Sequence, residues 1–293
     1  MPHSMDRETR ARKVREILRL VFWLNVSVVG IKLGVWFLSH ALSVLAEVGH
    51  SSLDAANNVF ALAMARVAGK GPDDDHPYGH QKFETLGALV LVGALSVTVF
   101  ELLKQAVFRF LRGGGADLHV DAWSISLMAV GAVAGLAISR FESRAGKHLG
   151  SDLLLADAAH TRADVFTTVS VLAGLLAVRW GYPVADPLAT VIVAALIAHT
   201  GWEILQETVP VLVDSRAVHP EHIEGLALSV DGVRSAYHIR SRGQAGEVFA
   251  ELTIAVDPDL DVATSHAIAD EVERRVARSL SARQVVIHVE PYE

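Results

Sequence analysis

Long apolar stretches alternate with short polar ones over roughly the first 208 residues. A helix that crosses a lipid bilayer needs about 20 mostly apolar residues. Six segments reach that length, so the pattern predicts an all-α bundle of six membrane-spanning helices in residues 1–208. They are expected at residues 17–38, 41–68, 84–110, 119–141, 150–179 and 186–206.

The pattern changes from residue 209 onward, where short alternating segments replace the long apolar ones. Residues 209–293 are expected to form helix 220–229, strand 233–242, strand 247–256, helix 262–279 and strand 284–290. This αββαβ order is typical of a small α+β, ferredoxin-like domain. Strand alternation assigns the core face to Tyr237, Ile239, Val248, Leu252, Ile254, Val285, Ile287 and Val289. It assigns the other face to His238, Glu251, His288 and Glu290.

Composition and charge narrow the class of protein. The chain is 51% hydrophobic, which is too apolar for an ordinary soluble domain, and it contains no cysteine, so a metal site must use His, Asp or Glu. Residues 209–293 carry 14 acidic and 8 basic side chains, which is −6 of the net charge of −7. An acidic chain without a basic aromatic stripe excludes nucleic-acid binding.

The basic residues indicate an orientation in the membrane. The N-terminal segment and the turn between the fourth and fifth spans, which contains Arg140, Arg144 and Lys147, are both basic. Basic segments stay on the cytoplasmic side, so we expect both termini in the cytoplasm, in a bacterial inner membrane. The first span follows a basic segment and lacks a small-residue cleavage site, which favours a retained helix over a signal peptide.

Two intramembrane pairs share one spacing. His50 precedes Asp54, and His160 precedes Asp164, by four residues, so each pair lies on one helix face. Either pair by itself could consist of polar groups satisfied within the bundle. Burying an aspartate in a membrane costs about 2.5–3.5 kcal/mol. Because the same pair occurs twice, a cation shared by the two aspartates explains this cost better. Two imidazoles and two carboxylates match tetrahedral Zn²⁺.

The order of several motifs resembles the cation diffusion facilitators, which are dimeric six-span transporters of zinc and other divalent metals with a cytoplasmic ferredoxin-like domain. The resemblance covers nearly the whole chain. It rests on "LAEVGHSSLDAANN", "DDDHPYGHQKFETL", "LLADAAHTRADVFTT", "YPVADPLAT" and "IADEVERRV" with "VVIHVEP". It implies a homodimer and a transport site of His50, Asp54, His160 and Asp164, of a type that is mostly zinc-preferring.

The resemblance implies further sites outside the membrane. Taken alone, "DDDHPYGH" reads as a solvated turn and helix cap, whereas the family pattern matches Asp73, His76 and His80 to a second metal site. Lys82 and Asp214 match a charge link near the dimer centre. The matching site in the C-terminal domain consists of His238, His266, His288 and Glu290, with Glu251 where a histidine is often found.

Arg162 departs from the pattern, because it is a cation between the two ligands of the fifth span. Two residues along a helix turn by about 200°, so its side chain should face away from the site. Asp157 and Glu47 are its candidate partners.

These features predict a transporter and not an enzyme. Ligation needs neutral imidazole and ionised carboxylate, so metal and protons compete, and we expect export of Zn²⁺ in exchange for protons by alternating access. Cd²⁺, Co²⁺ and Fe²⁺ fit the same ligands. Metal bound by two acidic C-terminal domains would regulate export. A membrane metal sensor or scaffold without flux stays open, and an intramembrane metalloenzyme ranks below it because H-E-x-x-H is absent.

Overall fold

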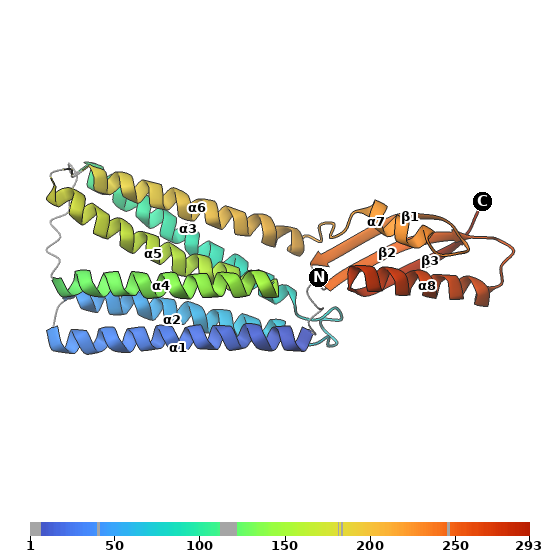
Figure 1. Cartoon of the computed structure of the whole chain (residues 1–293), viewed down its shortest axis with the longest axis horizontal. Coiled ribbons are helices and arrows are strands. Elements are labelled where there is room, and N and C mark those ends of the chain that lie inside the picture. The colour runs from blue at the N-terminus through green and yellow to red at the C-terminus, as the bar shows by residue number, and fades with distance from the viewer. Residues whose placement is uncertain (1–6, 40–41, 112–121, 181, 183, 245–246) are drawn as a thin grey trace. The chain divides into compact units, whose positions relative to one another are not determined.

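The computed structural model describes residues 7–39, 42–111, 122–180, 182, 184–244 and 247–293. The chain divides between Thr208 and Val209 into two compact units. Figure 1 shows long helices in one unit, and a small sheet with two helices in the other. This is the predicted fold class, a helical bundle followed by an α+β domain.

Six helices form the N-terminal unit, as the apolar pattern predicts. They are α1 (Arg7–Ser39), α2 (Leu42–Ala68), α3 (Lys82–Leu111), α4 (Ala122–Leu149), α5 (Asp152–Arg179) and α6 (Ala185–Leu212). Several run past the predicted segment; α1 begins ten residues earlier than expected, at Arg7. Hydropathy marks only the apolar part of a helix, whereas Arg, Lys and Glu at its ends continue the helix because their helix propensity is high.

Among the described residues, three helical segments are long and apolar enough to cross a membrane: Glu8–Gly34, Lys82–Leu111 and Pro187–Leu212. These belong to α1, α3 and α6. Polar residues lower the hydropathy of α2 and α5, and these residues build the site described below. Both polar helices pack against apolar ones: α2 lies along α1, and α5 lies along α3 and, more extensively, along α4.

One arginine near the start of α1 connects three parts of the bundle. The Arg10 guanidinium lies 3.0 Å from the Glu84 carboxylate of α3, and it donates to the carbonyls of Leu149 and Gly150 at 2.7 and 2.6 Å. Ser151 also donates to Glu84. We call these residues the Arg10 cluster. It joins α1, α3 and the turn between α4 and α5.

The C-terminal unit contains α7 (Pro220–Leu228), β1 (Val233–Gln244), β2 (Glu247–Val256), α8 (Val262–Leu280) and β3 (Ala282–Pro291). The strand order is β1-β2-β3, with β1 antiparallel and β3 parallel to β2. The predicted αββαβ order is therefore confirmed.

Both helices of this unit pack on one face of the sheet. Ile223 of α7 and Val272 of α8 are fully buried in one core with Leu252 and Ile254 of β2. The opposite sheet face is therefore not covered by either helix of this unit, and it carries the polar side chains, as the alternation predicts.

The prediction of Tyr237 as a core residue is wrong. The register of β1 against β2 shifts between Tyr237 and Arg240, and His238 within that shift has φ 52°. This irregularity puts Ala236 in the core and leaves Tyr237 partly exposed, where its hydroxyl donates to Glu290. Strict alternation fails here because one extra residue reverses the faces on one side of a bulge.

Candidate metal centre

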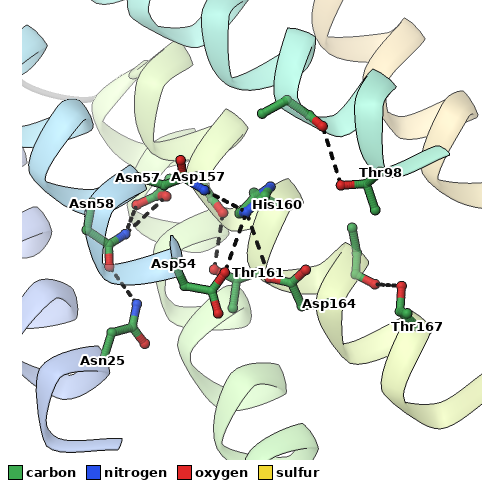
Figure 2. Close-up of polar contacts among 12 residues, drawn as sticks. Asn25, Asp54, Asn57, Asn58, Thr98, Asp157, His160, Thr161, Asp164 and Thr167 are labelled. Atoms are coloured by element: carbon green, nitrogen blue, oxygen red, sulfur yellow. Dashed lines mark hydrogen bonds and ion pairs between the residues drawn. The ribbon is translucent and has the colours of Figure 1, made fainter. Parts of the chain in front are cut away.

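Asp54 of α2 meets His160 and Asp164 of α5 inside the bundle (Figure 2). The Nε2 atom of His160 lies 3.8 Å from the Asp54 carboxylate and 3.9 Å from that of Asp164. One possible ligand atom from each residue lies within 4.8 Å of the other two. His160 is buried, and the two carboxylates are about one-fifth exposed, at 24% and 20%. The three side chains therefore converge on one point between α2 and α5.

The fourth expected ligand, His50, belongs to α2, but its side chain lies outside the described part of the structure. Its backbone precedes Asp54 by one helical turn.

Asn57 is a neighbour of this cluster that the sequence did not reveal as important. Its amide nitrogen lies 2.9 Å from Nε2 of His160. The same nitrogen faces the Asp54 and Asp164 carboxylates. A metal ion bound at Nε2 would therefore replace the contact between Asn57 and His160. The available signal was its position three residues after Asp54, on the same helix face.

A cavity of about 90 Å³ adjoins the two carboxylates, with room for several water molecules. Its walls come from α1, α2, α4 and α5 and include Asp54, Asp164 and Lys32. Lys32 is buried and donates to Ser51 at 2.8 Å. The cavity gives water, and hence a hydrated ion or a proton, a place beside the carboxylates.

Arg162 lies on another side of α5, near Leu95 of α3 and Ile197 of α6. It faces away from the three ligands, as helical geometry predicts. Asp157, one suggested partner, accepts hydrogen bonds from Asn58 instead. The side chain of the other suggested partner, Glu47, lies outside the described part of the chain.

The loop before α3 brings Asp73, His76 and His80 together, again with ligand atoms within 4.8 Å. Asp73 lies 3.2 Å from Nδ1 of His76 and 3.4 Å from Nε2 of His80. Nδ1 of His80 lies 3.0 Å from the Gly71 carbonyl, which only accepts, so Nδ1 carries a proton and Nε2 is the nitrogen that faces Asp73. The His76 backbone N–H lowers the pKa of the Asp73 carboxyl. The loop therefore brings two imidazoles together with a carboxyl group that is held in its ionised form.

The five expected ligands of the C-terminal domain do not gather into such a cluster within the described residues of one chain. Nε2 of His288 lies 3.3 Å from Glu290, whose carboxylate also accepts from Tyr237 and raises the pKa of that phenol. His238 and Glu251 are exposed. His266 belongs to α8, on the covered side of the sheet, and lies 3.8 Å from Asp270. This site stays a prediction.

The expected charge link is also untested. Asp214 forms an ion pair with Arg242 at 3.2 Å inside the C-terminal unit. Lys82 begins α3 in the other unit. The link between Lys82 and Asp214 therefore stays a prediction.

Comparisons with known proteins agree with this architecture. Residues 18–213 match the family model of the cation efflux transmembrane domain, and residues 216–292 match that of the cation efflux protein cytoplasmic domain. Metal tolerance protein 2 of Oryza sativa subsp. japonica is 30% identical over 283 residues, covering 86% of this chain and 72% of its own. Manganese efflux system protein MneS of Bacillus subtilis is 29% identical over 271 residues, covering 90% of each chain.

A solved structure of the MamM CTD is 27% identical and covers 25% of this chain and 92% of its own, with a TM-score of 0.24. The two family models together span almost all of the sequence. The chain therefore belongs to the cation diffusion facilitator family, as an integral membrane transporter for the efflux of divalent metal ions.

Proposed function

We propose that this chain exports Zn²⁺ in exchange for protons, through a site formed by Asp54, His160 and Asp164 with His50 as the fourth ligand. The observation that carries the proposal is the convergence of three ligand atoms from α2 and α5 within 4.8 Å. The adjoining cavity supports it, because an ion in transit needs water on one side of its site.

The ligand types favour zinc among the candidate metals. Two imidazoles with two carboxylates suit tetrahedral Zn²⁺, and affinity at such sites generally rises from Mn²⁺ through Fe²⁺ and Co²⁺ toward Zn²⁺. MneS is named for manganese efflux, so Mn²⁺ is the competing substrate to test first. Cd²⁺, Co²⁺ and Fe²⁺ complete the set.

Proton exchange follows from the same ligands. His160 binds metal only through a free Nε2 lone pair, and the aspartates bind only as carboxylates, so protons and metal compete for the site. Histidine has a reference pKa of about 6.5, which makes this competition sensitive to a modest pH difference across the membrane. Alternating access of the site would turn the competition into antiport.

The proposal also assigns roles to the two domains and to the metal-binding residues outside the membrane. We assign transport to residues 1–208, and metal binding with dimer formation to residues 209–293, with both termini in the cytoplasm of a bacterium. The loop cluster of Asp73, His76 and His80 is a second metal site facing the same side. Metal shared between the C-terminal domains of two copies would regulate export.

Vesicles containing the purified full-length protein test the proposal. The wild type should take up Zn²⁺ and dissipate an imposed pH gradient, whereas Asp54→Asn and Asp164→Asn should lose both activities. Glu101→Gln is the matched control, because this exposed carboxylate of α3 contacts only Lys104 among the contacts described. Zn²⁺ flux in the Asp54→Asn, Asp164→Asn double variant would refute the site.

Two further readouts separate the alternatives. Zinc flux that ignores the pH gradient would refute antiport, and metal binding without any flux would indicate a sensor. Competition between Zn²⁺ and Mn²⁺, Cd²⁺, Co²⁺ or Fe²⁺ in the same vesicles ranks the substrates. Stronger inhibition by Mn²⁺ than by unlabelled Zn²⁺ would refute the zinc preference.

A further inference from the structure

Two carboxyl groups that the metal site does not use face each other inside the bundle. Glu142 of α4 is 0% exposed and Asp157 of α5 is 1% exposed. Ser139, almost one helical turn before Glu142, donates to the carbonyl of Ala158, the residue after Asp157, at 2.7 Å, so both carboxyl groups lie where α4 packs against α5. No donor of the described residues reaches either oxygen of Glu142. The neighbour of Glu142 is thus another acceptor.

Two carboxylates cannot hydrogen-bond to each other unless one of them carries a proton. Leaving both ionised would place like charges side by side, away from water, which is the arrangement that forces one proton onto a carboxyl pair. Asp157 has a donor, because Nδ2 of Asn58 lies 3.2 and 3.0 Å from its two oxygens. Asp157 is therefore the acceptor of the pair, and Glu142 holds the proton.

We propose that Glu142 and Asp157 form a proton-binding site that empties when metal binds to Asp54, His160 and Asp164, and refills when the metal leaves. The inference rests on the proposed exchange of metal for protons and adds a proton carrier to it. The carrier differs from the metal ligands themselves.

The surroundings of the pair connect it to the metal centre. The ionisable group that acts on Glu142 is Asp157, and those that act on Asp157 are Glu142, His160 and Asp54. Asn58, which binds Asp157, follows Asn57, which binds His160 (Figure 2). A charge that changes at the metal centre is therefore felt at Asp157.

The sign of the coupling follows from charge. A divalent ion adds positive charge near Asp157, which stabilises the doubly ionised pair and weakens its hold on the proton. The O–H bond of Glu142 then breaks, the proton passes to water, and a carboxylate remains. Ile138, one helical turn before Glu142, lines the cavity beside Asp54 and Asp164, so water there would be a nearby acceptor for the proton. Metal release reverses the step.

A purely structural role would not call for two acids. Glutamine at residue 142 would offer an N–H to Asp157 with the same shape, whereas a second carboxyl needs a bound proton to avoid unpaired buried charge. The acid differs from the amide in being able to lose that proton.

Proton release on metal binding tests the inference directly. Zn²⁺ is added to the purified full-length protein in weak buffer with a pH indicator, for wild type, Glu142→Gln and the control Glu203→Gln, an exposed carboxylate of α6. Glu142→Gln should bind zinc but release about one proton fewer per zinc than wild type. Glu203→Gln should match wild type.

The outcomes separate the two proposals. Equal proton release by wild type and Glu142→Gln overturns the inference and leaves zinc–proton exchange intact. No release by either protein overturns the exchange, and the inference with it. If Glu142→Gln does not fold, infrared difference spectra of the wild type decide: a buried protonated carboxyl band must disappear on adding Zn²⁺, and its persistence overturns the inference.

Discussion

Replacing Arg10 by alanine should destabilise the transmembrane unit much more than the same replacement at Arg12. Both residues belong to α1 and each faces a glutamate, but their surroundings differ. Arg10 and Glu84 are 3.0 Å apart, with side chains 19% and 6% exposed. Arg12 and Glu16 are 3.8 Å apart, with side chains 65% and 60% exposed.

The magnitudes follow from what each change leaves behind. Without Arg10, the Glu84 carboxylate stays buried with Ser151 as its remaining donor, and two carbonyls lose a partner. Breaking a fully buried ion pair costs about 3–5 kcal/mol. We expect about 2–3 kcal/mol here, because Arg10 is partly solvated and a hydrogen bond to a charged group contributes about 1.5–3 kcal/mol. An exposed i,i+4 pair such as Arg12–Glu16 contributes about 0.3–0.5 kcal/mol.

Unfolding in mixed micelles with rising amounts of a denaturing detergent, followed by circular dichroism, measures both changes. Combining Arg10→Ala with Glu84→Gln should cost less than the sum of the two single changes, because each removes the same interaction. Equal destabilisation by Arg10→Ala and Arg12→Ala would refute the reasoning, since burial would then not determine the strength of the pair.

Three further predictions concern packing, the loop and pH. Gly87→Ala should destabilise the bundle by about 1–3 kcal/mol in the same unfolding assay, because the new Cβ would lie 2.9 Å from Met64. Gly93→Ala, whose Cβ would have nothing within 4 Å, should be neutral or stabilising. Equal losses of stability in the two variants would contradict this. Asp73→Ala should lower the number of zinc ions bound per chain in equilibrium dialysis, whereas Asp75→Ala should not, since Asp75 lies outside the cluster. Unchanged zinc binding by Asp73→Ala would refute the loop site. Backbone N–H donation from the first turn of α8 lowers the pKa of Asp261, so its capping contribution is complete above its unfolded pKa of about 3.9 and disappears as the pH falls through the lower folded value. Asp261→Asn should keep the cap and lose this pH dependence in amide hydrogen exchange of α8, and an unchanged acid profile would contradict it.

The sequence predicted the elements well because their patterns are local. Long apolar stretches specified six helices, and alternation with turn residues specified the αββαβ order of the C-terminal unit. Tyr237 was misplaced because a bulge in β1 is set by pairing with β2, which alternation along one strand does not register.

The candidate site was predictable only in part. The four-residue spacing of His160 and Asp164 marks one face of a helix, and Asp54 lies near them as expected. The roles of Asn57, Glu142 and Arg10 depend on which helix faces which, and the sequence of a single chain does not encode that contact in any local pattern. Asp157 is an example: the sequence suggested it as a partner of Arg162, whereas in the structure it accepts hydrogen bonds from Asn58.

The uneven hydropathy of the six helices has a consequence for biosynthesis. Segments of α1, α3 and α6 are apolar enough to partition into lipid alone, whereas α2 and α5 carry aspartates and histidines that oppose partitioning. In the folded bundle each polar helix packs against an apolar one, α2 against α1 and α5 against α3 as well as α4. Insertion beside such a neighbour would lower the cost of placing the polar side chains in lipid. A substitution that weakens the packing of a polar helix on its apolar neighbour would therefore reduce correct membrane insertion during synthesis, whatever its effect on transport.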